Sequence, residues 1–275
     1  MIAAEFFAGI GLARIGLEQA GFEVAWSNDI DQSKRDMYCG HFRDSPRRHR
    51  YQLADVASVS AADLPEGLAL AWASFPCVDV SLAGWRRGFR GSETSTFWQF
   101  ARVMDALGDA RPPVVALENV LGLATSHKGQ DLRKAIAELN RLGYVVDVLA
   151  VDALRFVPQS RQRLFLVGML RPPAVEAAPA DARDLRPAWL DWVFDDASLH
   201  TVRAALPEPP PLRGGGFAEV AERLDDADER WWDSRRVKAF EASLSPLQAQ
   251  RLDLLRERAE ASLRTAYRRT RHGVA

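Results

Sequence analysis

The chain has 275 residues, of which 47% are hydrophobic and 27% charged, and its formal net charge is −1. This length is enough for a full hydrophobic core, as one large domain or as one domain with a smaller appendage. A net charge near zero is unusual for a protein that binds nucleic acid only through bulk positive charge. The sequence contains no long uninterrupted apolar run and does not open with a basic segment followed by an apolar one, so we expect a cytoplasmic protein.

Two cysteines, Cys39 and Cys77, are too few for a disulfide framework or a four-ligand zinc site. We therefore predict no metal centre and favour an intracellular thiol role, with simple burial as the alternative. Arginine supplies nearly all of the 36 basic residues. Arginine suits contacts with phosphates and base edges, although GC-rich coding explains the same bias equally well.

The first 170 residues alternate short apolar runs with helical patterns, which is typical of a parallel sheet with helices on both faces. We predict strands at residues 2–7, 23–28, 70–74, 113–118, 145–152 and 164–169. A helix is predicted over 131–142, since Leu132, Ile136 and Leu139 share one face and Gly143 can cap its end. The fold class expected is a doubly wound, Rossmann-like α/β sheet.

The composition changes after residue 171. Proline-rich and glycine-rich pieces at 207–211 and 214–216 indicate linkers or loops. The segment 245–271 predicts an exposed, partly amphipathic helix, to which we assign no chemistry. We therefore divide the chain into a domain over 1–172 and a linker with a helical extension over 173–275.

A glycine-containing turn follows the first predicted strand, at Phe7-Ala8-Gly9-Ile10-Gly11. Glycines at a helix start let a ligand approach the backbone, and Asp29, about 20 residues on at the end of the second strand, can bind ribose hydroxyls. The third small residue of a dinucleotide fingerprint is replaced by Arg14, and a turn glycine without a ligand is a frequent alternative. Adenosine binding without a pyrophosphate is the natural inference.

A possible nucleophile follows the strand predicted at 70–74. Cys77 comes just past the carboxyl end of that strand, after Pro76, where a thiolate would lie on the ligand side of the sheet. A lone cysteine is more often a small buried hydrophobe. Glu118 ends the next strand and is a candidate acid or hydrogen-bond donor, unless it is a simple cap.

Two arginines lie at the start of the last predicted strand. Arg161 and Arg163 project to the same side of an extended chain and could orient an acid or hold a phosphate or a base carbonyl. An ordinary exposed strand start is the alternative.

Together, these four clusters resemble the C5-cytosine DNA methyltransferase family. Phe7-Ala8-Gly9-Ile10-Gly11 resembles its first cofactor motif, Pro76-Cys77 its catalytic loop, and Glu118-Asn119-Val120 its Glu-Asn-Val motif. The segment 159–163, Gln-Ser-Arg-Gln-Arg, resembles its Gln-x-Arg-x-Arg motif. The resemblance covers about residues 1–170, and Thr201-Val202-Arg203 is similar to the connector that follows.

The resemblance implies a DNA (cytosine-5) methyltransferase that acts on a flipped cytosine in double-stranded DNA, uses S-adenosyl-L-methionine and releases S-adenosyl-L-homocysteine, and serves bacterial restriction-modification. It implies that residues 1–172 are the catalytic domain. The implied catalytic residues are Cys77, Glu118, Arg161 and Arg163. The implied cofactor contacts are Phe7, Ala8, Gly9, Gly11, Leu12, Asp29, Ile30, Asp55, Val56 and Pro76, and the implied DNA contacts are Ser81, Arg86, Arg87 and Arg90.

Two family features are not evident in this sequence: the variable target-recognition region, towards which 173–275 would lead, and the final Gly-Asn-Ser-type motif. Leu12 also replaces a frequent glycine. A shortened chain, a second subunit that supplies the rest, and a defective remnant remain alternatives. An RNA-directed relative acting on transfer RNA and a non-catalytic subunit that binds S-adenosylmethionine or DNA are the rival functions.

Overall fold

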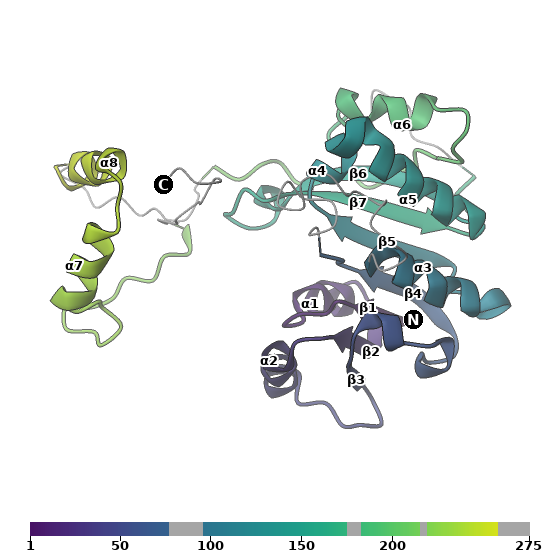
Figure 1. Cartoon of the computed structure of the whole chain (residues 1–275), viewed down its shortest axis with the longest axis horizontal. Helices are drawn as coiled ribbons and strands as arrows, with labels where there is room; N and C mark the ends of the chain where they lie inside the picture. The colour runs from purple at the N-terminus through teal and green to yellow at the C-terminus, as the bar shows by residue number, and fades with distance from the viewer. Residues whose placement is uncertain (77–95, 175–182, 215–218, 258–275) are drawn as a thin grey trace. The chain divides into compact units, whose positions relative to one another are not determined.

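The computed structural model describes residues 1–76, 96–174, 183–214 and 219–257. The chain folds as two compact units (Figure 1). The first comprises Met1–Asp152 with Arg161–Pro209, and the second comprises Ala153–Ser160 with Pro210–Ala275. In the described part, no helix is long and apolar enough to cross a membrane.

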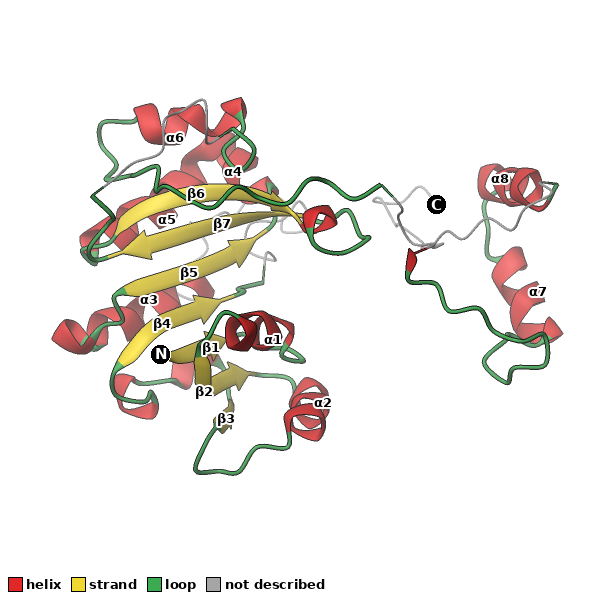
Figure 2. Ribbon diagram, turned by 180° about the vertical axis from the view of Figure 1, so that it is seen from behind, coloured by secondary structure: helices red, strands yellow, loops and turns green. Residues whose placement is uncertain are grey.

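A seven-stranded sheet forms the centre of the first unit (Figure 2), and its strand order is β3-β2-β1-β4-β5-β7-β6. The strands are β1 (Ile2–Phe6), β2 (Glu23–Asp29), β3 (Arg50–Leu53), β4 (Leu68–Ala73), β5 (Val114–Asn119), β6 (Val145–Asp152) and β7 (Gln162–Met169). The order reverses between β1 and β4, as in a doubly wound sheet, which confirms the predicted fold class.

The prediction of an all-parallel sheet is wrong at one strand. β7 runs antiparallel to both β5 and β6, between which it lies. The link from β6 to β7 spans only residues 153–161, and a connection this short lacks the crossover helix that parallel neighbours require. An antiparallel strand begins at the edge where its parallel neighbours end. The first residues of β7 therefore lie beside the last residues of β5.

The sequence also gave no sign of β3, which pairs in parallel with β2 at the edge of the sheet. Its four residues are exposed or half-buried, so they lack the apolar alternation that identifies a strand.

Helices cover both faces of the sheet. On one face, α3 (Thr96–Ala106) and α5 (Gln130–Arg141) bury apolar residues in the main core, together with Phe6, Leu117 and Leu166 from the strands. α5 confirms the predicted helix, and Gly143, with φ of 90°, follows its last turn. On the other face, α1 (Leu12–Gln19) packs Leu17 into a smaller apolar cluster.

The described residues form five further α-helices. They are α2 (Gln32–Phe42), α4 (Gly122–Thr125), α6 (Asp191–Asp195), α7 (Ser234–Ala242) and α8 (Pro246–Arg256). α8 begins after Ser245, whose side chain accepts from the backbone of Gln248, and it buries no residue. The prediction of an exposed helix is thus confirmed over 246–256, while its continuation from 258 lies outside the described residues.

Candidate functional site

The carboxyl edge of the sheet, where β1 to β5 end and β7 begins, carries most of the residues selected from the sequence. The loop after β1 has left-handed backbone at Phe7 (φ 57°), Gly9 (φ 57°) and Gly11 (φ 87°). The amide of Ala8 donates to the carbonyl of Asn28 at 2.8 Å, which ties this loop to the end of β2. The loop thus presents its backbone at the start of α1, as an approaching ligand requires.

Asp29, the last residue of β2, joins the two neighbouring loops. Its Oδ2 accepts the amide of Gly9 at 2.9 Å, and its Oδ1 accepts the amide of Asp31 at 3.0 Å. The ammonium group of Lys34 lies 3.8 Å from Oδ1. Each carboxylate oxygen has a second lone pair, so Asp29 can hold the loop and still accept a ligand hydroxyl.

The space beside this loop is open and flanked by apolar side chains. A Cβ on Gly9 would meet no atom within 4 Å. Leu12, at the start of α1, is 70% exposed, and Ile30, just after β2, is 67% exposed. Exposed apolar side chains beside an accessible backbone suit a ligand with an apolar surface and polar edges, such as a nucleoside.

Asp55 and Val56 follow β3 at the same edge. The Asp55 side chain accepts the amide of Ala57 at 2.8 Å and caps a short helical turn, Val56–Ser58. Val56 is buried in the main core, so its side chain points into the protein. Of this pair, the exposed Asp55 is the residue whose side chain is accessible.

β4 leads towards the predicted nucleophile. Phe75 is buried and Pro76, the last described residue of this segment, is exposed. Cys77 and the predicted DNA contacts Ser81, Arg86, Arg87 and Arg90 lie outside the described residues. Cys39 is exposed on α2 and was not assigned to the site.

Glu118 and Arg163 meet across the β5–β7 pair. Arg163 Nε lies 2.7 Å from Glu118 Oε1, and each side chain is 21% exposed. Glu118 is paired with Phe165 in the β7 register, so Arg163, two residues earlier, lies on the same face. The ion pair is thus half-buried at the carboxyl edge, where both groups can still reach a bound molecule. Arg161 precedes β7 with an exposed side chain, and its amide donates to Asp152 Oδ1 at 2.7 Å.

Asn119, part of the motif in the sequence but given no role there, connects this ion pair to the end of β4. Its Nδ2 donates to the carbonyl of Phe75 at 3.2 Å, and its Oδ1 accepts the amide of Val120 at 2.9 Å. Asn119 is 3% exposed. This buried bridge fixes the residue next to Glu118 to the backbone two positions before Cys77.

A doubly wound sheet with a glycine loop after the first strand and an acid at the end of the second defines a class of α/β proteins that bind adenosine-containing ligands. Residues 1–191 match the model of the C-5 cytosine-specific DNA methylase family. The chain therefore belongs to this family.

Curated relatives match the same part of the chain. It is 35% identical over 165 residues to the Type II methyltransferase M.DsaV of Dactylococcopsis salina, covering 60% of this chain and 44% of that protein. It is 35% identical over 173 residues to the Type II methyltransferase M.BanI of Aneurinibacillus aneurinilyticus, covering 60% and 38%. The chain thus spans less than half the length of these two relatives.

A solved structure shares the fold. The crystal structure of a DNMT2 variant from Spodoptera frugiperda superposes with a TM-score of 0.56 at 16% identity, over 82% of this chain and 60% of that one. At this identity, the likeness concerns the fold alone.

Proposed function

We propose that this chain is the catalytic part of a DNA (cytosine-5) methyltransferase that uses S-adenosyl-L-methionine and acts in restriction-modification. Family membership supports the reaction class. The observation that carries the proposal is the Glu118–Arg163 ion pair, half-buried at the carboxyl edge and tied by Asn119 to the segment that leads to Cys77.

The residues at the edge fit the cofactor. The backbone of Phe7, Ala8, Gly9 and Gly11 would face it, Asp29 would accept its ribose hydroxyls, and the exposed Leu12 and Ile30 would cover apolar parts. Asp55, Val56 and Pro76 complete the proposed contacts. When bound, the cofactor supplies an electrophilic methyl group.

The chain's own residues would prepare the cytosine. Cys77, as thiolate, adds to C6, and the electron pair of the C5–C6 bond becomes available at C5, which can then accept the methyl group. Glu118 hydrogen-bonds N3 and the exocyclic amine and stabilises charge that enters the ring. Arg163 holds Glu118 and can donate to the base carbonyl, and Arg161 supports the pocket. Loss of the C5 proton and of the Cys77 thiolate restores the aromatic ring.

The target base must leave the duplex for this chemistry, at a cost of a few kcal/mol. Ser81, Arg86, Arg87 and Arg90 are the proposed DNA contacts for this step. We also propose that residues 1–172 act as the catalytic domain and that 173–275 lead to a target-recognition region. A second subunit stays a prediction, which copurification with an affinity-tagged chain would test.

A covalent trap tests the function. The 275-residue chain, together with any subunit that copurifies with it, is incubated with S-adenosylmethionine and duplex DNA containing 5-fluorocytosine, which has no C5 proton to lose. We expect an adduct that survives denaturing electrophoresis and maps by mass spectrometry to Cys77. Cys39→Ser should preserve this adduct and Cys77→Ser should abolish it.

Two outcomes would contradict the proposal. A chain that binds the cofactor but forms no adduct at Cys77 favours a non-catalytic binding subunit. Methyl transfer from labelled cofactor to transfer RNA in preference to DNA favours the RNA-directed alternative.

A further inference from the structure

The loop that carries Phe7, Gly9 and Gly11 holds three left-handed residues within five positions. Left-handed backbone is unfavourable for a residue with a side chain, and Phe7 is such a residue. A loop of this shape persists only when its surroundings fix it.

Aromatic rings of α2 lie directly beneath the loop. A Cβ on Gly11 would come within 2.4 Å of Phe42 Cε2 and 2.8 Å of Tyr38 Cε2, so only glycine fits between loop and rings. Tyr51 of β3 packs edge-on against Tyr38, with ring centroids 4.9 Å apart, and its hydroxyl donates to the carbonyl of Gly9 at 3.5 Å. These rings form the support under the loop.

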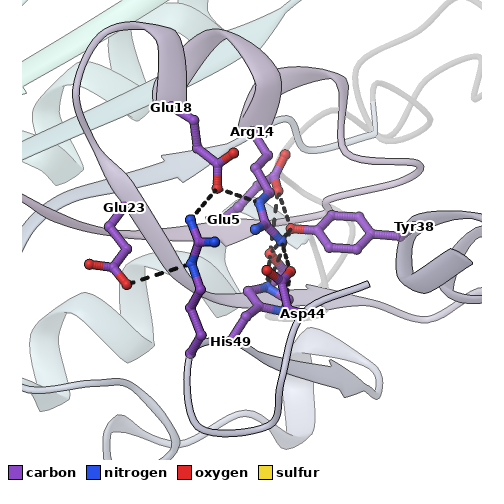
Figure 3. Close-up of polar contacts among 9 residues, drawn as sticks. Glu5, Arg14, Glu18, Glu23, Tyr38, Asp44 and His49 are labelled. Carbon is purple, nitrogen blue, oxygen red and sulfur yellow. Dashed lines mark hydrogen bonds and ion pairs between the residues drawn. The ribbon is translucent and has the colours of Figure 1, made fainter. Parts of the chain in front are cut away.

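Arg14, which the sequence showed only as a departure from a small residue, holds this support in place (Figure 3). Its Nε donates to Glu18 at 2.8 Å, and its Nη1 donates to Asp44 at 2.5 Å and to the Tyr38 hydroxyl at 3.3 Å. The guanidinium carbon lies 4.0 Å from the centre of the Phe42 ring. Arg14 is 1% exposed, so its plane is fixed by these partners from α1, α2 and the loop that follows α2.

The Tyr38 hydroxyl is also anchored to the sheet. It lies 2.8 Å from Ser27 Oγ and 3.3 Å from His49 Nε2, and it donates to Glu5 Oε2 at 3.4 Å. Figure 3 shows Arg14, Tyr38, Glu5, Asp44 and His49 converging on this point. Because Tyr38 is fully buried, its ring cannot move without breaking these bonds.

From this arrangement we infer that Arg14 and Tyr38 are positioning residues for the cofactor loop, holding Phe7 to Gly11 in the binding conformation from the side opposite the cofactor. The inference rests on the proposed function. Both residues are buried behind the loop, so they act through its backbone. An ordinary contribution to core stability is the competing explanation, and the test must separate the two.

The test compares Arg14→Lys with Leu17→Val in the full chain. Lysine keeps the charge, but one ammonium group cannot donate to Glu18 and Asp44 while stacking on Phe42. Leu17 lies on the same helix, buried in the other apolar cluster, and serves as the control for lost stability. Affinity for S-adenosylhomocysteine by calorimetry, melting temperature, and amide hydrogen exchange at residues 8–11 are measured for each protein.

For Arg14→Lys we expect the Kd to rise about fivefold or more, which corresponds to roughly 1 kcal/mol, with faster exchange at residues 8–11. Leu17→Val should lower the melting temperature and leave both the Kd and the loop exchange unchanged. Tyr38→Phe, which keeps the ring and removes the anchored hydroxyl, should show the same loop effect and serves if Arg14→Lys does not fold.

The inference would be overturned if the changes in Kd and in loop exchange were proportional to the loss of melting temperature, in the same way for Arg14→Lys, Tyr38→Phe and Leu17→Val. A parent chain that does not bind S-adenosylhomocysteine contradicts the proposed function instead. The loop inference is then decided by hydrogen exchange, where unchanged protection of residues 8–11 in both Arg14→Lys and Tyr38→Phe would overturn it.

Discussion

The two halves of the carboxyl edge use charged side chains in opposite ways. At the β1–β2 half, Glu5 and Arg14 are buried and lie behind the loop. At the β5–β7 half, Glu118 and Arg163 are each 21% exposed and lie at the edge itself. Glu5 and Arg14 can therefore only fix the backbone around them, whereas the half-buried Glu118–Arg163 pair can also contact a bound molecule. Position behind the loop or at the edge itself therefore separates support from chemistry.

Glu118→Gln removes the charge of the half-buried carboxylate at the β5–β7 half of the edge, and it has the largest expected effect on methyl transfer. The amide keeps the shape of the side chain but loses the charge that pairs with Arg163 and the proton that a carboxylic acid can donate. We expect methyl transfer to fall by about 10²–10³-fold, the loss that removal of one preorganised electrostatic contact with the reacting group causes. Single-turnover transfer from labelled cofactor measures it.

Glu138→Gln is the matched control for that change. Glu138 forms an ion pair with Arg141 on α5, remote from the edge, so its loss should leave methyl transfer unchanged. Equal losses in both variants would mean that the charge at Glu118 has no special role.

Glu5→Gln tests the buried carboxylate at the β1–β2 half through the pH dependence of the unfolding free energy. Burial raises the pKa of Glu5 from 4.5 to about 7, although hydrogen bonds from Ser27 and Tyr38 and the nearby Arg14 act against the shift. The folded chain therefore keeps a proton that the unfolded chain loses, and Glu5 lowers stability as the pH rises from about 4.5 to 7. A shift of this size corresponds to roughly 3 kcal/mol.

His49, in the same cluster, acts in the opposite direction. Burial and the Arg14 charge lower its pKa to about 4, while Asp44 opposes the shift, so His49 adds stability as the pH rises from about 4 to 6.5. The His49 contribution is common to both proteins and cancels in the difference between Glu5→Gln and the parent. Urea unfolding from pH 4.5 to 7.5 should show that difference rising in favour of the variant; a constant difference would contradict the raised pKa.

Asn119→Ala tests whether the hydrogen bond between β5 and the end of β4 serves catalysis as well as stability. It removes the donor to the buried carbonyl of Phe75, at an expected cost of about 1–3 kcal/mol in unfolding free energy. Because Phe75 lies two residues before Cys77, the rate of adduct formation should fall as well. Loss of stability with an unchanged trapping rate would limit Asn119 to a structural role.

Glu23→Gln has the smallest expected effect and is the control for Glu5→Gln. Glu23 begins β2, its side chain is 54% exposed, and it lies 4.0 Å from Arg48. Exposed pairs contribute at most about 1 kcal/mol. The urea midpoint should therefore stay close to that of the parent at every pH, and a pH-dependent difference as large as that of Glu5→Gln would remove the contrast between buried and exposed carboxylates.

The sequence predicted six of the seven strands that the described residues form, because their apolar runs reflect burial in the sheet. It could not give the direction of β7, since an apolar run reads the same in parallel and antiparallel pairs. β3 was missed because a short, polar edge strand has little apolar surface to bury. The helix α7, which buries no residue, was not predicted either.

At the site, local motifs located the glycine loop, Glu118 and Arg163, because each lies at a strand end. The role of Arg14 could not be found in this way. Its partners Tyr38 and Asp44 lie 24 and 30 residues away along the chain, and only folding brings them beneath the loop. A charged residue inside an apolar helix pattern is the one signal that could have indicated a buried pair.

Because β7 pairs with β5 in a fixed register, the number of residues between Arg163 and Phe165 decides whether Arg163 faces Glu118. Side chains alternate along a strand, so one residue added between Arg163 and Phe165, which pairs with Glu118, would turn the guanidinium to the opposite face and remove it from Glu118. The same residue added to the connection at 153–161 would be taken up by the loop. Insertions and deletions in natural or engineered versions of this chain should therefore be found in the connection at 153–161 and not within β7.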